Sequence, residues 1–130
     1  MIVSLHVATG AAGGALAGKR IRAAVLGALL HAVGDAIPHR DIDSDGFEAA
    51  SGLVVLGLVA GARGVFDPAV VGAAAASAPD IEHLLPLRSR DGRKIFPSHR
   101  FEGWHREGGL PAWLQLLAAG VIVGALLTRR

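Results

Sequence analysis

Apolar residues fall into five long stretches along the chain, separated by short segments that carry charged residues, glycine or proline. The stretches cover residues 2 to 17, 20 to 37, 47 to 62, 68 to 85 and 110 to 128. β-Branched and aromatic residues are too sparse, and strict alternation of apolar and polar positions too rare, to indicate strands. The pattern predicts an all-α protein, an up-and-down bundle of about five helices in one domain over residues 1–130.

The last stretch is the strongest transmembrane candidate. Leu110 to Thr128 carries no charge over 19 residues and is followed by Arg129 and Arg130, and one bilayer crossing takes ~20 apolar residues. The other four stretches are shorter, so each alone would also suit a buried helix of a soluble bundle. Basic residues divide almost evenly between the two ends of the predicted bundle, so the orientation across a membrane stays open.

Glycine spacing favours a membrane setting. The G-x-x-x-G spacing recurs on three stretches, at Gly10–Gly14–Gly18, Gly57–Gly61 and Gly120–Gly124. Glycine inside a soluble helix costs ~1 kcal/mol relative to alanine, whereas in lipid it lets helices approach closely. We therefore expect a membrane-embedded protein in contact with lipid, although the same spacing arises by chance in a soluble bundle with 18 glycines. The glycines would serve packing within the chain or self-association into a homo-oligomer equally well.

Composition narrows the chemistry. Apolar residues make up 52% of the chain and charged residues 18%, below the roughly 25% of ordinary soluble domains. The net charge of +2 is a small excess, so no nucleic-acid partner is expected. Because the chain has no cysteine, any metal would be bound by His, Asp and Glu. A signal peptide ending near Ala17 is an alternative for the first stretch, and its removal would take His6 away.

All the histidines fall at or near one end of the predicted bundle. They are His6, His31, His39, His83, His99 and His105. Because successive helices of an up-and-down bundle alternate in direction, the N-terminus, segment 38–46 and segment 86–109 meet at that end. The basic loops at the opposite end contain no histidine. This distribution predicts a metal site built from helix ends and the adjoining loops.

His31 and Asp35 lie four residues apart on one face of an apolar helix. An imidazole and a carboxylate at this spacing can share a metal ion, and ionisable residues in apolar helices are usually paired and functional. A structural hydrogen bond between them is the alternative. The aspartates of segment 41–45 partly match a calcium loop whose completing glutamate is absent, so we interpret them as a solvated turn with one extra ligand at most. His39 is either a ligand or a surface residue.

A second cluster is Pro79-Asp80-Ile81-Glu82-His83. Asp80 and His83 are three residues apart, so they can point the same way from one helical turn. A hard carboxylate beside an imidazole suits zinc, iron or manganese.

The third cluster, segment 98–106, adds His99 and His105 from an irregular stretch. For His105, which follows Trp104, the alternative is a histidine at a membrane interface. Arg100 either binds a phosphate group through its guanidinium or is a solvated charge.

Together these motifs resemble a family of bacterial inner-membrane metal-dependent hydrolases. That family carries P-D-[IL]-[DE]-H followed by H-R-G-x-T-H, to be compared here with Pro79-Asp80-Ile81-Glu82-His83 and with segment 99–105, and an N-terminal histidine such as His6 belongs to its pattern. The later motif is one residue longer here, and Trp104 replaces its Thr. The His31-x-x-x-Asp35 step resembles the ligand pair of zinc-dependent phospholipase C and related single-strand nucleases, helical enzymes that cluster two or three zinc ions.

The resemblance implies a multi-pass protein of the inner membrane that hydrolyses phosphoesters, such as phospholipids or small molecules, with a metal-activated water. Two or three zinc ions are expected, with manganese or iron as alternatives. The expected ligands are His6, His31, Asp35, His39, Asp80, His83, His99 and His105. The expected catalytic residues are Asp35, Asp80, Glu82 and Arg100. Asp35 or Asp80 would bridge two metal ions, and Glu82 would orient one of the histidines. The alternatives are a membrane protein that binds or transports metal without catalysis, and a scaffold protein with no metal.

Overall fold

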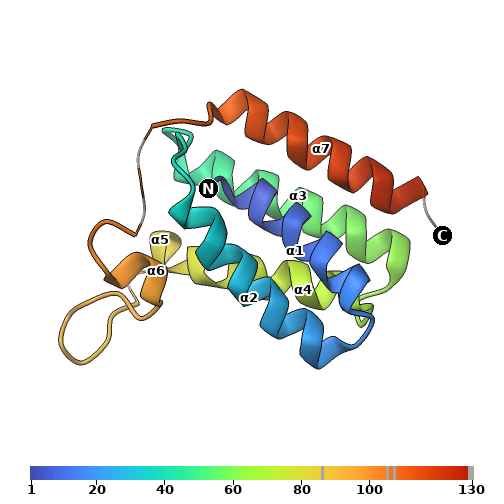
Figure 1. Cartoon of the computed structure of the whole chain (residues 1–130), viewed down its shortest axis with the longest axis horizontal. Coiled ribbons are helices and arrows are strands. Elements are labelled where there is room, and N and C mark those ends of the chain that lie inside the picture. The colour runs from blue at the N-terminus through green and yellow to red at the C-terminus, as the bar shows by residue number, and fades with distance from the viewer. Residues whose placement is uncertain (86, 105, 107, 129–130) are drawn as a thin grey trace.

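The computed structural model describes residues 1–85, 87–104, 106 and 108–128, and this part of the chain contains helices and no strand, which confirms the all-α prediction. The elements are α1 (Val3–Ala17), α2 (Arg20–Ala36), α3 (Asp45–Arg63), α4 (Pro68–Ser77), the 3-10 turn η1 (Ala78–Asp80), α5 (Ile81–Leu84), α6 (Pro97–Arg100) and α7 (Ala112–Thr128). The longer helices α1, α2, α3, α4 and α7 run in alternate directions along the bundle (Figure 1).

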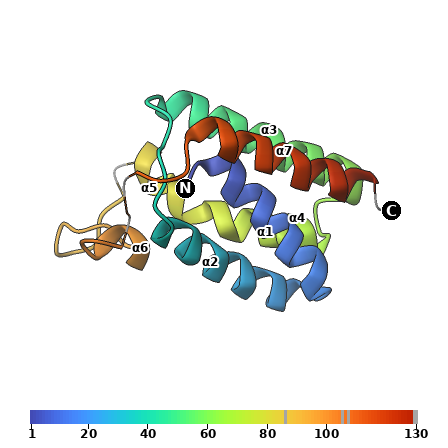
Figure 2. The same cartoon turned by 45° about the horizontal axis from the view of Figure 1, so that its top comes forward.

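Helix α1 lies in the middle of the bundle, where α2, α3, α4 and α7 all pack against it (Figure 2). It is apolar on every side because it has neighbours on every side. Val7, Ala8 and Ala11 are among its fully buried side chains. His6 therefore sits on the most enclosed helix of the molecule, a place where an imidazole needs polar partners.

Helix α4 packs closely against both α1 and α2 at glycines. A Cβ atom at Gly10 would lie 2.5 Å from the carbonyl oxygen of Gly72, and one at Gly27 would lie 2.3 Å from the same oxygen. A Cβ atom at Gly14 would come within 2.1 Å of the Pro68 carbonyl oxygen. Only glycine fits at these positions, so the Gly10–Gly14 step serves packing within the chain.

The other glycine steps have a different setting. Within the described part of the chain, an added Cβ atom would meet nothing within 4 Å at Gly57, Gly61, Gly120 or Gly124. These glycines lie on the outer faces of α3 and α7 and do not bring two described helices together.

The predicted helix over residues 68 to 85 is divided into α4, η1 and α5. Pro79 lies in η1, where its missing N–H prevents a regular α-helical hydrogen bond. The short helix α6, in the stretch interpreted as loop, begins at Pro97, a residue type favoured in a first helical turn. Both differences from the predicted helices lie in the segments that carry Asp80, Glu82 and His99.

Two hydrogen-bonded loops close the site end of the bundle. The backbone N–H of His39 donates to the carbonyl of Arg106, and the N–H of Leu110 donates to the carbonyl of Pro38. The segment before α3 is thereby tied to the segment before α7. Helix α7 starts at Ala112 and has 17 residues, two fewer than the 19 uncharged residues that the sequence suggested, because the residue before Pro111 is kept out of the helix.

Among the described residues, α3 is the helix that is both long and apolar enough to cross a membrane, while α1 and α7 are apolar but shorter. Length and composition thus identify one candidate span. Several helices nevertheless expose apolar side chains at every fourth position, as at Ile21, Val25, Leu29 and Val33 on α2 and Trp113, Leu117 and Val121 on α7.

Candidate metal centre

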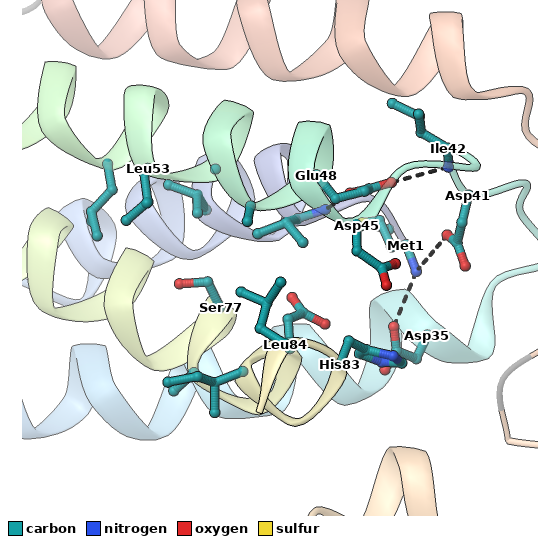
Figure 3. A pocket seen from close by; sticks show the side chains of 18 of the residues that line it. Met1, Asp35, Asp41, Ile42, Asp45, Glu48, Leu53, Ser77, His83 and Leu84 are labelled. Atoms are coloured by element: carbon teal, nitrogen blue, oxygen red, sulfur yellow. Dashed lines mark hydrogen bonds and ion pairs between the residues drawn. The ribbon is translucent and has the colours of Figure 1, made fainter. Parts of the chain in front are cut away.

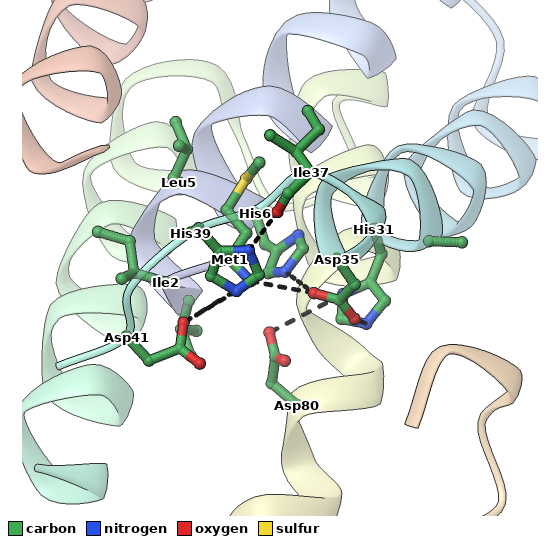
Figure 4. Close-up of polar contacts among 12 residues, drawn as sticks. Met1, Ile2, Leu5, His6, His31, Asp35, Ile37, His39, Asp41 and Asp80 are labelled. Atoms are coloured by element: carbon green, nitrogen blue, oxygen red, sulfur yellow. Dashed lines mark hydrogen bonds and ion pairs between the residues drawn. The ribbon is translucent and has the colours of Figure 1, made fainter. Parts of the chain in front are cut away.

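Histidine and aspartate side chains from four elements meet beside the N-terminus of α1. They are His6 from α1, His31 and Asp35 from α2, Asp80 from η1 and His99 from α6. Figure 4 shows His6, His31 and Asp80 arranged around the carboxylate of Asp35. His6, His31 and Asp35 are at most 1% exposed. The structure thus brings together five of the residues that the sequence analysis singled out.

Asp35 is the centre of the cluster. Its Oδ1 lies 3.0 Å from Nε2 of His6, and its Oδ2 lies 3.0 Å from Nε2 of His31 and 3.5 Å from Nε2 of His99. Ligand atoms that share one zinc ion at ~2.1 Å in a tetrahedron are about 3.4 Å apart. The measured separations are those of hydrogen bonds, and they are also close to the spacing of ligand atoms around a small cation.

Two overlapping sets of ligand atoms have the compactness of a metal site. One set is His6, His31 and Asp35, and the other is His31, Asp80 and His99; within each, the atoms lie within 4.8 Å of one another. Imidazole nitrogen with carboxylate oxygen suits zinc, manganese or iron. The donor chemistry and the spacing both fit a divalent transition metal.

Hydrogen bonds on the far side of His31 and His99 orient these rings. Nδ1 of His31 donates to the carbonyl oxygen of Ala76 at 2.8 Å, and Nδ1 of His99 donates to Oε2 of Glu82 at 3.1 Å. The Nε2 atoms of both rings then face Asp35. Such an outer partner fixes the tautomer of a metal-binding histidine and increases its basicity.

Glu82 is itself held in place. Its Oε1 accepts hydrogen bonds from the backbone N–H groups of Ile95 and Phe96. Burial opposes ionisation, but the bond from Ile95 together with those from His99 and Phe96 outweighs it and lowers the pKa of Glu82. For His99, burial opposes the charged form, but hydrogen bonds with Asp35 and Glu82 outweigh it and raise its pKa. Glu82 is a fixed anion that steers His99.

Asp80 carries the clearest mark of an incomplete polar site. Its Oδ2 is buried and has no hydrogen-bond partner among the described residues. Nδ1 of His31 lies 4.0 Å from this oxygen, and Nε2 of His99 lies 3.9 Å from Oδ1 of the same carboxyl. Burial raises the pKa of Asp80 to about 7. A buried carboxyl without partners is costly, and a cation bound between Asp80, His31 and His99 would compensate it.

His39 lies beside the cluster and faces a different group. Its Nδ1 donates to the carbonyl of Ile37 at 2.6 Å, and its Nε2 makes a short contact with the amine of Met1 and lies 3.1 Å from Oδ1 of Asp41. The Met1 amine in turn lies 3.1 Å from Oδ1 of Asp35. His39 is 1% exposed, so the sequence alternative of a surface residue is wrong.

The remaining predicted residues lie at the edge of the site or beyond it. His83 is exposed, with its ring centroid 4.7 Å from that of His99 and its Nδ1 3.3 Å from Nζ of Lys94. Arg100 forms an ion pair with Asp91 at 2.6 Å on the outer loop. His105 lies outside the described residues.

Two polar side chains that the sequence analysis passed over secure the site end. Glu48 accepts hydrogen bonds from the backbone N–H groups of Val3 and Ile42. Gln115 accepts from the N–H of Ile2 and donates to the carbonyl of Arg40. Both hold the start of α1, and hence His6, against the segment before α3. In the sequence, each of these two residues is a lone polar residue in an apolar stretch. That pattern alone does not indicate which group the side chain hydrogen-bonds.

A cavity of about 350 Å³ opens beside the cluster, and Asp35, Asp80, His83 and His99 contribute to its wall. A catalytic metal site differs from a purely structural one by keeping a position open for water or substrate. The cluster has space next to it for a bound molecule.

The chain matches no protein-family model, no curated protein and no solved structure.

Proposed function

We propose that the protein is a membrane-embedded, metal-dependent hydrolase that cleaves phosphoesters, including phospholipids, with water. The observation that carries the proposal is the convergence of three imidazole Nε2 atoms on Asp35, with the Asp80 carboxyl beside them and no hydrogen-bond partner for Oδ2 of Asp80 in the described chain. Most buried polar atoms in native proteins are hydrogen-bonded, and a bound cation would give Oδ2 of Asp80 the partner that it lacks among the described residues.

In this proposal, the first metal ion is bound by His31, Asp35, Asp80 and His99. His6 lies on the other oxygen of Asp35, which allows Asp35 to bridge to a second ion, as the sequence analysis expected. Zinc is the first choice for imidazole and carboxylate donors, and manganese or iron would accept the same donors. When bound, such an ion supplies a Lewis acid and brings the pKa of a bound water toward neutrality.

The chain's own groups have defined tasks in this proposal. Glu82 holds His99 in the orientation that presents Nε2. Asp35 and Asp80 provide negative charge that offsets the charge of the cation. Hydrolysis then breaks a P–O bond of the substrate, with the oxygen of water forming the new bond to phosphorus and the leaving group departing with a proton. The cavity beside Asp80 and His99 provides access for the substrate.

Exposed apolar stripes support the membrane setting. On α2, Ile21, Val25, Leu29 and Val33 are 57–82% exposed. Contiguous apolar patches of this kind are unusual on soluble monomers and mark contact with protein or membrane. A phospholipid substrate is consistent with this setting and with the resemblance of the Asp80 and His99 motifs to inner-membrane hydrolases.

The test is elemental analysis of the detergent-purified protein beside Asp35→Ala, with Asp43→Ala as the matched control. Asp43 is exposed on the loop before α3, so its loss should leave metal content unchanged. We expect stoichiometric zinc-type metal in the wild type and in Asp43→Ala, and its loss in Asp35→Ala. Hydrolysis of bis-para-nitrophenyl phosphate should disappear with a chelator and return with zinc.

Asp80→Asn is a second variant in case Asp35→Ala does not fold. It keeps the size of the side chain and removes a carboxyl group that is already partly neutral. We expect a folded protein with weakened metal binding. Absence of metal from the wild type after reconstitution with zinc, manganese or iron would overturn the proposal. Stoichiometric metal without any phosphoester hydrolysis would instead favour a metal-binding or transport protein.

A further inference from the structure

The cavity beside the metal ligands has two chemically different ends. Carboxylates and imidazoles line one end, and most of the remaining wall is apolar, with Val7 on α1, Leu56 on α3 and Ala74 on α4, beside the hydroxyl-bearing Ser77. Figure 3 shows this separation: Asp35 and His83 lie on one side of the view, and Leu53 lies on the other. A ligand that matches both ends must be polar at one end only.

The apolar end is open at its rim. Leu53 and Leu84 line the cavity and are also 68% and 51% exposed. Leu53 comes from α3, the helix long and apolar enough to cross a membrane. An apolar opening at this helix allows a hydrocarbon chain to enter from the lipid side while its polar group reaches the cluster.

The size of the cavity decides how much hydrocarbon it can hold. Small-molecule sites commonly measure about 300–1,000 Å³, and the volume of about 350 Å³ lies at the lower end of that range. This volume suits one aliphatic chain together with its polar group.

We propose that the substrate is an amphiphile with one aliphatic chain in this cavity and an anionic phosphate group at the Asp35–Asp80 end. This inference rests on the proposed function, because a bound divalent cation is what would make that acidic end attractive to an anion. It narrows the proposed substrate from phosphoesters in general to single-chain lipid phosphates and phosphoesters. The apolar wall would set the length of aliphatic chain that the cavity accepts.

Neighbouring alanines on α3 offer a matched pair of variants. Ala49 lines the cavity, and Ala50, the next residue, is exposed and does not line it. Phenylalanine at position 49 would fill part of the apolar end, whereas phenylalanine at position 50 would add the same side chain outside. The pair separates occupation of the cavity from any general effect of an added aromatic ring.

The experiment measures binding of hexyl, decyl and tetradecyl phosphate to zinc-loaded protein in a bulky steroid-based detergent by calorimetry. We expect affinity to rise with chain length until the cavity is full. Decyl phosphate should bind Ala49→Phe about 15-fold more weakly than Ala50→Phe, the change that corresponds to two methylene groups at about 0.8 kcal/mol each. Both variants meet the same detergent, so their ratio isolates the cavity. Unfolding temperature and zinc content verify that each variant is intact.

The two proposals fail separately. Zinc binding and phosphodiester hydrolysis with equal decyl phosphate affinity in both variants would overturn the single-chain inference and leave the hydrolase intact. A protein that binds no metal but still distinguishes the variants would overturn both the hydrolase and the placement of a phosphate group at the Asp35–Asp80 end, and would leave only a cavity that binds an aliphatic chain. If Ala49→Phe does not fold, Ala74→Leu, which alters the α4 wall of the cavity, replaces it in the same comparison, with the same outcomes.

Discussion

At the scale of single residues, the orientation of His31 and His99 depends on groups that lie on the side of each ring away from Asp35. The carbonyl of Ala76 and the carboxylate of Glu82 occupy the Nδ1 side of the two rings. Each ring is thereby left with Nε2 toward Asp35. Outer partners of this kind typically change metal affinity 10–100-fold when they are mutated, so Glu82 is a positioning residue that can be tested by itself.

We predict that Glu82→Gln weakens zinc affinity by about 10–100-fold. The amide retains the size of the side chain, but it carries no charge and can turn an NH₂ donor toward the Nδ1–H of His99. Competition with a chromophoric chelator measures the affinity. Glu102→Gln is the control, because Glu102 is exposed in the same region. An equal affinity for zinc in both variants would show that Glu82 does not orient a ligand.

Local spacing explains why several site residues were recognisable from sequence. His31 and Asp35 share a helix face because they are four residues apart, and the alternation of helix direction brought His6 to the same end. The structure places Arg100 differently, in an ion pair with Asp91. That pairing depends on the course of the loop before α6, for which the sequence contains no periodic signal.

At the scale of helices, two glycine pairs with the same spacing differ in their surroundings: one is packed against another helix and the other is open. Gly14 packs against the backbone of α4, while Gly61 has open space around it. The contact of α1 with α4 positions His6 relative to Asp80, so the first pattern supports the site.

Gly14→Ala should therefore destabilise the fold, by about 1–3 kcal/mol as for other overpacked positions. Gly61→Ala should leave stability unchanged or increase it by up to about 1 kcal/mol through better helix propensity. Thermal unfolding in detergent compares the two variants. Equal loss of stability in both would contradict the close approach of α1 and α4.

At the scale of the whole molecule, exposed apolar side chains form stripes along α2 and α7. The exposed stripes of α2 and α7 lie on outer faces of the bundle, and charged residues gather toward its ends. A bilayer would cover these stripes and leave the metal ligands near one interface.

Two lysine variants on the same stripe of α2 test this setting. Leu29 lies in the middle of α2 and Ile21 near its start, and both are exposed. In a bilayer, a central lysine costs about 2.5–3.5 kcal/mol, whereas a lysine near a helix end reaches the interface. We expect Leu29→Lys to lower the carbonate-resistant membrane fraction and Ile21→Lys to leave it unchanged. If both variants and the wild type are monodisperse without detergent, the membrane setting is wrong.

By itself, the sequence determined the helical class, the approximate helix positions and the clustering of His6, His31, Asp35, Asp80 and His99, because these follow from local spacing and from the alternation of helix direction. Only the tertiary structure decided which ring nitrogens face Asp35, that Glu82 holds His99, which glycines form helix contacts, and that an apolar cavity adjoins the ligands. Those features depend on side chains far apart in the chain, and their relative placement is set by packing rather than by local periodicity.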